Sequence, residues 1–252
     1  MDSDEKKAFS RQDAIDRLRQ GAVPQHVGLI MDGNGRWAIS RGKSRSDGHR
    51  AGVERLRSVL RFSADVGIKA LTVYAFSKEN WKRPRWEVET LMRLLIDFLD
   101  RELPDLNREG VQIRFIGDRD GISSRVLAAM DRARESTRQN ERIVFNVAFN
   151  YGGRDEIVRA TRHLMAAAAA GRIAPEQLDE AAFDAQLDTS ALPAVDLVIR
   201  TSGEERLSNF LLWQCAYAEF VFVQEHWPDF DDDRYARALA QYQERNRRFG
   251  GV

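Results

Sequence analysis

Apolar residues along this chain fall into short continuous runs, separated by longer stretches in which apolar positions keep helical spacing. Continuous apolar runs of strand length are typical of strands that are covered on both faces. Strands that alternate with helices predict a parallel sheet, so we expect one α/β domain with a mainly parallel, six-stranded central sheet flanked by helices. The six predicted strands are Val27–Met31, Ala70–Phe76, Val111–Ile116, Ile143–Phe149, Asp196–Ile199 and Phe220–Gln224.

Helical spacing is clear between these runs. Val53, Leu56, Leu60 and Ala64 recur on one helical face, and Gly67 follows as a natural C-terminal stop. Similar spacing predicts helices around residues 126–133 and 157–170.

The segment from Glu87 to Leu103 is unusual because it is apolar on nearly every side. Such a helix is buried on more than one face. It therefore predicts either core packing with a subunit contact, or the wall of a tunnel for an apolar ligand.

The N-terminal region has a pattern of its own. Ser10 and Asp13 predict a helix cap, and Ile15, Leu18 and then Gly21 follow. We expect residues 1–25 to form a peripheral helix and lead-in, lying on the domain or on a membrane, and residues 26–252 to form one domain. No linker-like stretch divides the chain.

Composition excludes several classes of protein. Lys+Arg and Asp+Glu both total 39, so the net charge of zero argues against a general polyanion binder. Cys215 is the only cysteine, which excludes a disulfide framework and a thiolate metal site. Without a signal-peptide core or an apolar run of membrane-spanning length, we expect a cytoplasmic protein.

The segment 27–38 carries the strongest chemical signal. Asp32 directly follows the predicted buried strand, and Gly33, Gly35 and Arg36 come after it. Two glycines allow a tight turn with exposed backbone N–H groups, and a following helix would add positive charge at its N-terminus. This pattern predicts a phosphate site. Asp32 at its edge would repel phosphate unless a cation lay between them, which indicates a metal-bridged diphosphate.

Two familiar phosphate motifs fit less well. Residues 33–38 match the dinucleotide pattern G-x-G-x-x-A, but an acid precedes the first glycine, and Glu54, at the ribose-binding spacing, falls inside a predicted helix. A nicotinamide-dependent oxidoreductase therefore stays as a minor alternative. Gly42-Lys43-Ser44 imitates the end of a P-loop, but Trp37 stands where that motif begins with glycine, which excludes it.

Two further loops follow predicted strands and should reach the same sheet edge. Residues 76–84 combine charged, polar and aromatic side chains, and would otherwise be interpreted as a solvated loop. Residues 196–209 place Arg200, Arg206 and Ser208 after a strand, which suits a second diphosphate. The alternative is a surface salt-bridge cluster with Glu204 and Glu205.

Three other features have less specific chemistry. Glu219 lies between aromatic residues at the start of the last strand, where an acid usually needs a partner or a metal. Residues 229–233 are rich in aspartate, but they precede a helix, where acids simply favour the N-terminus. His49 lies on the basic loop and could contact a phosphate or donate a proton.

These residues match a known family. The chain resembles the cis-prenyltransferases over about residues 26–251. The shared motifs are MDGNGRWA at 31–38, GHRAG at 48–52, YAFSKENWKRP at 74–84, NYGGR at 150–154, DLVIRTSGEERLSNFLLWQ at 196–214 and WPDF at 227–230.

The resemblance implies successive Mg²⁺-dependent additions of isopentenyl diphosphate to an allylic diphosphate such as farnesyl diphosphate. The product would be a long-chain polyprenyl diphosphate, such as undecaprenyl diphosphate for the lipid carrier of cell-wall synthesis. By motif position, Asp32 would be the catalytic carboxylate that handles Mg²⁺, and Asn80 a candidate in proton removal. The implied substrate-binding residues are Gly33, Asn34, Gly35, Arg36, Trp37, Arg45, His49, Ser77, Glu79, Trp81, Arg83, Arg200, Arg206 and Ser208.

The resemblance also implies a homodimer, in which Arg248-Phe249-Gly250 reaches across to the partner and Glu219 contacts Mg²⁺, from the partner subunit in one arrangement. An apolar tunnel would hold the growing chain, and peripheral membrane contact would serve product release; no nucleic acid is expected. Mg²⁺ suits few carboxylates combined with phosphate oxygens and water, which agrees with a sparse acidic site among arginines.

Two positions depart from the family pattern. Glu205 stands where close relatives often carry histidine, and Phe149 where some long-chain members carry a small residue. Phe149 would shorten the product if it projects into the tunnel, and would have no such effect if it points to the other face of its strand. A short- or medium-chain product, or a non-catalytic partner subunit, are the alternatives; the intact Asp32 loop disfavours the second.

Overall fold

All six apolar runs become strands of one sheet in the computed structural model, which describes residues 10–245. Every neighbouring pair is parallel, and the spatial order is β3-β4-β2-β1-β5-β6. The prediction of a six-stranded, mainly parallel sheet is therefore confirmed, with strand ends shifted by one or two residues. The strands are β1 (His26–Ile30), β2 (Ala70–Ser77), β3 (Val111–Ile116), β4 (Ile143–Tyr151), β5 (Leu197–Arg200) and β6 (Glu219–Phe222).

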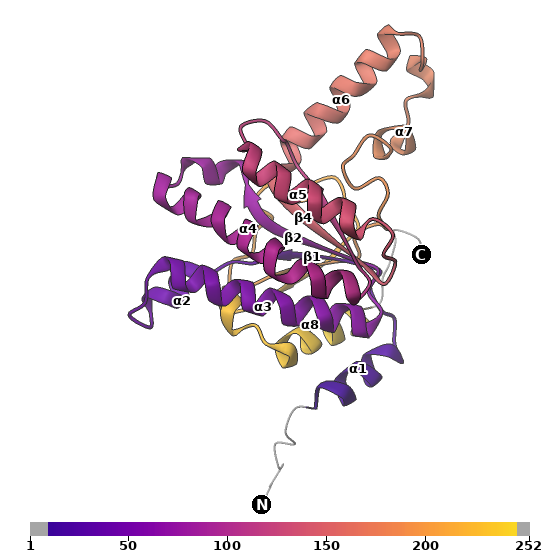
Figure 1. Ribbon diagram of the computed structural model, residues 1–252. Helices are drawn as coiled ribbons and strands as arrows, with labels where there is room; N and C mark the ends of the chain where they lie inside the picture. The colour runs from indigo at the N-terminus through magenta and orange to yellow at the C-terminus, as the bar shows by residue number, and fades with distance from the viewer. Residues whose placement is uncertain (1–9, 246–252) are drawn as a thin grey trace, which may run out of the picture.

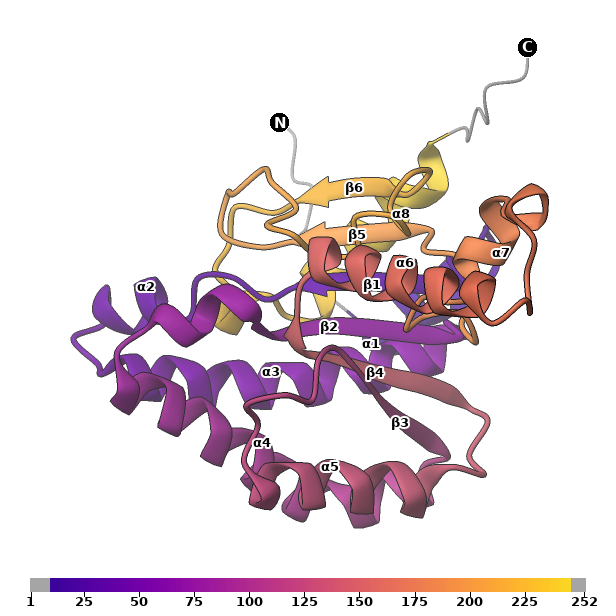
Figure 2. The ribbon, with the colours of Figure 1, turned by 90° about the horizontal axis from the view of Figure 1, so that it is seen from above.

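Helices cover both faces of the sheet unequally. Figures 1 and 2 show α3, α4 and α5 packed side by side along one face, where the larger apolar core lies. In a smaller core on the other face, strand residues such as Val198 and Tyr151 pack with Phe210, Leu211 and Cys215 from the segment between β5 and β6. The helices are α1 (Arg11–Arg19), α2 (Asn34–Ile39), α3 (Arg45–Val66), α4 (Arg85–Arg108), α5 (Ser124–Thr137), α6 (Gly153–Ala169), α7 (Glu180–Asp184) and α8 (Asp232–Glu244), with short 3₁₀ turns η1 (Lys78–Lys82), η2 (Pro175–Gln177) and η3 (Trp227–Asp229).

Several predicted helix ends are visible in the structure. Ser10 caps α1 by accepting a hydrogen bond from the Asp13 N–H at 3.2 Å, and Ile15 and Leu18 of that helix are buried. Gly67 ends α3 with a φ of 104°. The aspartate-rich segment behaves as expected of a helix N-terminus, because the Asp231 side chain caps α8 by accepting from the Arg234 N–H at 3.0 Å.

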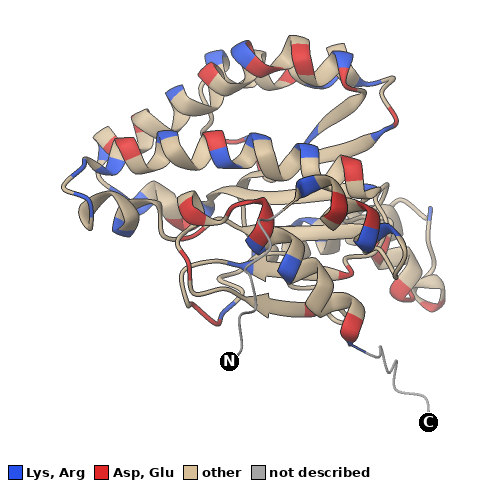
Figure 3. Ribbon diagram, turned by 90° about the horizontal axis from the view of Figure 1, so that it is seen from below, with Lys and Arg blue, Asp and Glu red and all other residues tan. Residues whose placement is uncertain are grey.

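The sheet register places the chemically interesting loops at one edge. Ile30 of β1 pairs with Arg200 of β5, so Asp32 and Arg200 leave the sheet side by side. Ser77, the last residue of β2, lies at the same carboxyl-terminal edge. Lys and Arg alternate with Asp and Glu over the helices seen in Figure 3, in keeping with the net charge of zero. None of the helices described is long and apolar enough to cross a membrane.

Candidate active site

Asp32 is held between two arginines from different parts of the chain. Its Oδ2 accepts a hydrogen bond from Arg200 at 2.9 Å, and its Oδ1 accepts from Arg36 at 3.1 Å and from the Gly33 N–H at 2.7 Å. Burial alone would raise the pKa of Asp32, but the hydrogen bond and charge of Arg200, with the help of Arg36 and Gly33, lower it below its ordinary value. The carboxylate is therefore ionised across the whole neutral range.

The turn after Asp32 depends on glycine at two places. Gly33, the cap residue directly before α2, has a φ of 96°, and a Cβ there would lie 2.6 Å from the Ser202 hydroxyl. A Cβ on Gly48 of α3 would lie 2.0 Å from the carbonyl oxygen of Asn34, so this glycine lets α3 cross close against α2. The short helix that carries Asn34 and Arg36 is thereby locked beside Asp32.

The second predicted cradle is also formed. Arg200 donates to the Ser208 hydroxyl at 2.7 Å and to the carbonyl of Arg206. Between residues 202 and 211, four residues other than glycine have a positive φ: Ser202, Ser208, Asn209 and Leu211. Such conformations cost free energy and persist where the surrounding structure enforces them, commonly at functional sites.

Glu204 joins the two cradles. Its carboxylate pairs with Arg36 at 2.7 Å and with Arg206. The Glu204 carboxylate thus lies between Arg36 and Arg206, a position between two cations that would also suit a diphosphate group. From the sequence, Glu204 was assigned only to a surface salt-bridge cluster. Glu205, the departure from the family pattern, makes no ion pair among the described residues.

A second ionic cluster surrounds Glu87, which the sequence analysis missed. This buried carboxylate lies 2.8 Å from Arg83, 3.5 Å from Arg45 and 3.6 Å from His49. Burial lowers the pKa of His49 more than the nearby Glu87 raises it, so the imidazole is neutral at pH 7. The available signal was an acid in the first turn of α4, three residues after Pro84 and directly before the apolar Val88.

The loop after β2 is short and well connected. The Asn80 side chain accepts from the Ser77 N–H at 3.1 Å, and the Trp81 indole donates to Asn150 at 2.7 Å. Glu79 accepts from Asn209 at 2.9 Å. Lys78 pairs with Asp118 and Asp155, which ties the loop to the segment after β3 and to α6.

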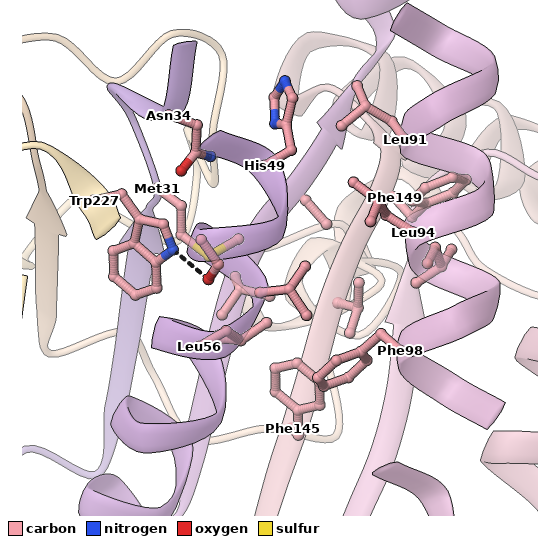
Figure 4. Close-up of a pocket in the computed structure, with 16 residues that line it drawn as sticks. Met31, Asn34, His49, Leu56, Leu91, Leu94, Phe98, Phe145, Phe149 and Trp227 are labelled. Atoms are coloured by element: carbon pink, nitrogen blue, oxygen red, sulfur yellow. Dashed lines mark hydrogen bonds between the residues drawn. The ribbon is translucent and has the colours of Figure 1, made fainter. Parts of the chain in front are cut away.

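An apolar cavity of about 110 Å³ lies under the sheet edge, between α3 and α4. Asn34 and His49 line one end and Phe98 and Phe145 the other (Figure 4). Phe149 lines this cavity and is almost fully buried, which resolves the strand-face ambiguity in favour of the cavity side. Leu91, Leu94, Leu95 and Phe98 of α4 supply one wall. The structure shows this pocket, and a tunnel long enough for a polyprenyl chain stays a prediction.

A magnesium site would have to rely on the substrate. Within residues 10–245, no three His, Cys, Asp or Glu side chains gather into a metal-binding group. Mg²⁺ commonly uses one or two carboxylates together with substrate phosphates and water, and Asp32 among cationic side chains fits that pattern. Asn34 Oδ1 is buried with no hydrogen-bond partner in the described chain, and it lies against α3, 2.5 Å from where a Cβ on Gly52 would be.

Two predicted site residues lie elsewhere. Glu219 pairs in register with Leu197 at the opposite end of β5 from Arg200, and it forms a 2.8 Å ion pair with Arg245. It is therefore not a ligand beside Asp32 within one chain. Trp37 donates to Asp229 at 2.7 Å, and Arg41 stacks on its ring 4.7 Å from the centroid, so its contacts are away from the Asp32 cluster. Arg248-Phe249-Gly250 lies outside the described residues.

Comparison with known proteins gives a consistent result. A prenyltransferase family model, described as "Putative undecaprenyl diphosphate synthase", matches residues 30–250. An isoprenyl transferase from Agrobacterium fabrum is 50% identical over 233 residues, covering 92% of this chain and 94% of the relative. An isoprenyl transferase from Bacillus subtilis is 47% identical over 244 residues, covering 97% of this chain and 92% of the relative.

Solved structures agree on the fold. A lavandulyl diphosphate synthase from Lavandula x intermedia, in complex with dimethylallyl diphosphate, superposes with a TM-score of 0.89 at 37% identity, covering 91% of this chain and 99% of that one. A probable undecaprenyl diphosphate synthase from Campylobacter jejuni gives a TM-score of 0.76 at 31% identity, covering 91% and 100%.

Proposed function

Because this chain belongs to the undecaprenyl diphosphate synthase family of prenyltransferases, we propose that it adds isopentenyl diphosphate repeatedly to an allylic diphosphate, such as farnesyl diphosphate, to form cis double bonds. The observation that carries this proposal is the arrangement of two cationic cradles joined through Asp32, whose sequence neighbours Met31 and Asn34 line an apolar cavity. Neither a dinucleotide site nor a non-catalytic subunit would need this arrangement.

The allylic diphosphate belongs beside Asp32 in this scheme. Arg36, Arg45 and the N–H groups that begin α2 bind its oxygens, and neutral His49 contributes a hydrogen bond without adding charge. Asp32 would hold Mg²⁺ together with the diphosphate, and the ion would supply stabilisation for the negative charge of the leaving group. Asp32 also keeps Arg200 aligned between the two cradles.

Isopentenyl diphosphate belongs in the second cradle. Arg200, Arg206 and Ser208 bind its diphosphate, and Glu204 has to release its pairing with Arg206 when that diphosphate arrives. Asn80, on the loop after β2, would face the carbon from which a proton leaves. The resemblance to the family implies that this loop closes over the substrates, and closure would exclude water, which strengthens every charge interaction at the reacting carbon.

The apolar cavity would receive the growing hydrocarbon, since each buried methylene contributes about 0.8 kcal/mol. We propose a long-chain product such as undecaprenyl diphosphate. The alternative, a short- or medium-chain product, is favoured by Phe149, which fills part of the cavity, and by the likeness to a lavandulyl diphosphate synthase. Because the cavity measures only about 110 Å³, elongation beyond the first steps requires α4 to move or the rings of Phe98, Phe145 and Phe149 to rotate.

A homodimer would complete the site. β6 is an edge strand of the sheet, and Tyr217 and Phe222 beside it are exposed aromatic side chains. Within residues 10–245, β6 pairs with β5 alone, and a strand edge with exposed apolar residues favours association. In such a dimer, Glu219 could contact a Mg²⁺ ion bound by the partner subunit, although it does not lie beside Asp32 of its own chain. We place the enzyme in the cytoplasm, with peripheral membrane contact when the apolar product leaves.

The test combines purified protein with labelled isopentenyl diphosphate and farnesyl diphosphate, with and without Mg²⁺, and sizes the dephosphorylated product by chromatography. A polyprenol that forms only with Mg²⁺ supports the proposal, and its length decides between the two products. Absence of product with farnesyl or shorter primers contradicts catalysis and favours a partner-subunit role. NADPH binding in a fluorescence titration would instead favour the oxidoreductase alternative.

A further inference from the structure

Asn209 connects three segments that the proposed reaction must coordinate. It follows Ser208, which Arg200 binds, and it adopts a left-handed conformation with a φ of 66°. Its side-chain amide donates to Glu79 Oε1 at 2.9 Å, and its Oδ1 accepts from the Arg154 N–H at 2.9 Å. Its backbone carbonyl accepts from the Gly153 N–H at 2.7 Å. Both polar groups of its side chain, the amide nitrogen and the amide oxygen, therefore have a hydrogen-bond partner.

Helix α6 shows why the residue is held so firmly. Gly152 at the N-cap of α6 has no side chain with which to satisfy the first N–H groups, and Asn209 satisfies two of them from another part of the chain. A Cβ on Gly152 would lie 2.7 Å from the Asn209 amide nitrogen, so the glycine is what allows this approach. Two of the hydrogen bonds of Asn209 therefore serve the N-terminus of α6.

The remaining contact, to Glu79, has no such structural purpose. Glu79 is an exposed residue of η1, the turn at the start of the loop after β2. Burial raises the pKa of Glu79, and the Asn209 hydrogen bond is the foremost of the contacts that lower it overall. The bond joins this loop to the residue that directly follows Ser208 of the second cradle.

We propose that Asn209 is a positioning residue that couples occupancy of the Arg200–Ser208 cradle to the position of the loop bearing Glu79. A diphosphate on Arg200 and Ser208 steadies the 208–209 backbone, and Asn209 then holds Glu79 and the loop behind it in place. This inference rests on the proposed function in that isopentenyl diphosphate is the ligand of this cradle.

Asn209→Asp separates coupling from structure. Asp caps a helix as well as Asn does, so the melting temperature should not change, but the variant places a carboxylate against Glu79. We expect the KM for isopentenyl diphosphate to rise about fivefold, since an exposed charge-assisted hydrogen bond is replaced by repulsion. The KM for the allylic diphosphate should stay the same. Adding Glu79→Gln should bring the KM for isopentenyl diphosphate most of the way back to the wild-type value, because the Gln amide can donate a hydrogen bond to the introduced carboxylate. The single variant Glu79→Gln completes the double-mutant cycle.

Asn107→Asp is the matched control, because it adds the same charge at the far end of α4, on an exposed residue. It should leave both KM values unchanged. Wild-type kinetics for Asn209→Asp, or failure of Glu79→Gln to restore them, would overturn the proposal.

A second readout does not depend on activity. Lys82 is exposed in the loop, so trypsin should cut after it, and inorganic diphosphate should slow this cut in the wild type. Asn209→Asp should be cut faster and should lose most of the protection, and Glu79→Gln should restore it. Equal cutting of all variants contradicts the coupling even if the enzyme is active. Restored protection supports it even if no polyprenol forms, in which case the proposed function alone has failed.

Discussion

The charged sheet edge and the apolar cavity are built in opposite ways, although Asn34 and His49 stand between them. At the edge, each side chain is fixed by directed bonds, as Asp32 is by Arg36, Arg200 and Gly33. In the cavity, most of the lining side chains from α3, α4, β2 and β4 are apolar and are held by packing rather than by directed bonds. Catalysis or substrate binding should therefore respond sharply to single changes at the edge, whereas product length should respond gradually to volume in the cavity.

The largest effect is expected at the edge. Asp32→Ala should lower kcat more than about a thousandfold, because it removes the carboxylate for the cation and leaves Arg36 and Arg200 facing each other. The measurement is product formation at saturating substrates, with circular dichroism to verify the fold. Asp233→Ala, an exchange of the same kind on α8, should retain activity. Turnover by Asp32→Ala would remove the catalytic assignment.

Next in size is a change in the cavity. Phe149→Ala should lower the free energy of unfolding by about 3 to 5 kcal/mol and lengthen the product, because it deletes a buried ring from the cavity wall. Phe62→Ala is the matched control, since Phe62 is equally buried but packs on Tyr235 outside the cavity. It should lose similar stability without changing length. A longer product from both variants would mean that general loosening sets the length.

Arg206→Ala should have a smaller effect, confined to binding. Loss of one arginine from the second cradle should raise the KM for isopentenyl diphosphate about tenfold, with the KM for the allylic diphosphate unchanged. Arg237→Ala on α8, which also removes an exposed ion-paired arginine, serves as control. An equal rise in both KM values would argue against two separate cradles.

The smallest effect is expected at the boundary between the regions. Burial lowers the pKa of His49 below 6.5, so below about pH 6.5 the unfolded chain takes up a proton that the folded chain resists. Stability is therefore expected to fall as the pH is lowered from about 7.5 to about 5.5. Thermal melts at the two pH values should show a smaller fall for His49→Gln. His26, whose pKa burial also lowers, should account for part of what remains. If His49→Gln loses as much stability as the wild type between the two pH values, a group other than His49 causes the pH dependence.

Sequence patterns anticipated the edge better than the cavity for a physical reason. Strand runs ending at Asp32, Phe76 and Ile199 identify the sheet edge, because parallel strands share one carboxyl-terminal side. Bonds between motifs were not predictable, since contacts such as Glu204 with Arg36, Glu87 with His49 and Asn209 with Glu79 form only through tertiary packing. Their sequence context, a salt-bridge cluster or a helix start, is equally typical of surface residues.

The cavity could not be predicted in the same way. Helical periodicity showed that α4 is apolar on several sides, but periodicity does not tell whether the facing elements fill the space. The direction of Phe149 depended on the register between β2 and β4, which shifts between Tyr74 and Ser77. The sequence could not show where Glu219 lies relative to Asp32, because the order of the motifs does not tell which end of its strand is close to the site.

The most direct test of this account is to measure the KM for isopentenyl diphosphate and the product-length distribution on the same preparations of Arg206→Ala and Phe149→Ala. The account predicts that Arg206→Ala changes only the KM, and that Phe149→Ala changes only the length when substrates are saturating. If Arg206→Ala alters the length at saturation, or Phe149→Ala leaves it unaltered, the division between a charged edge that performs the chemistry and a cavity that measures the chain is wrong.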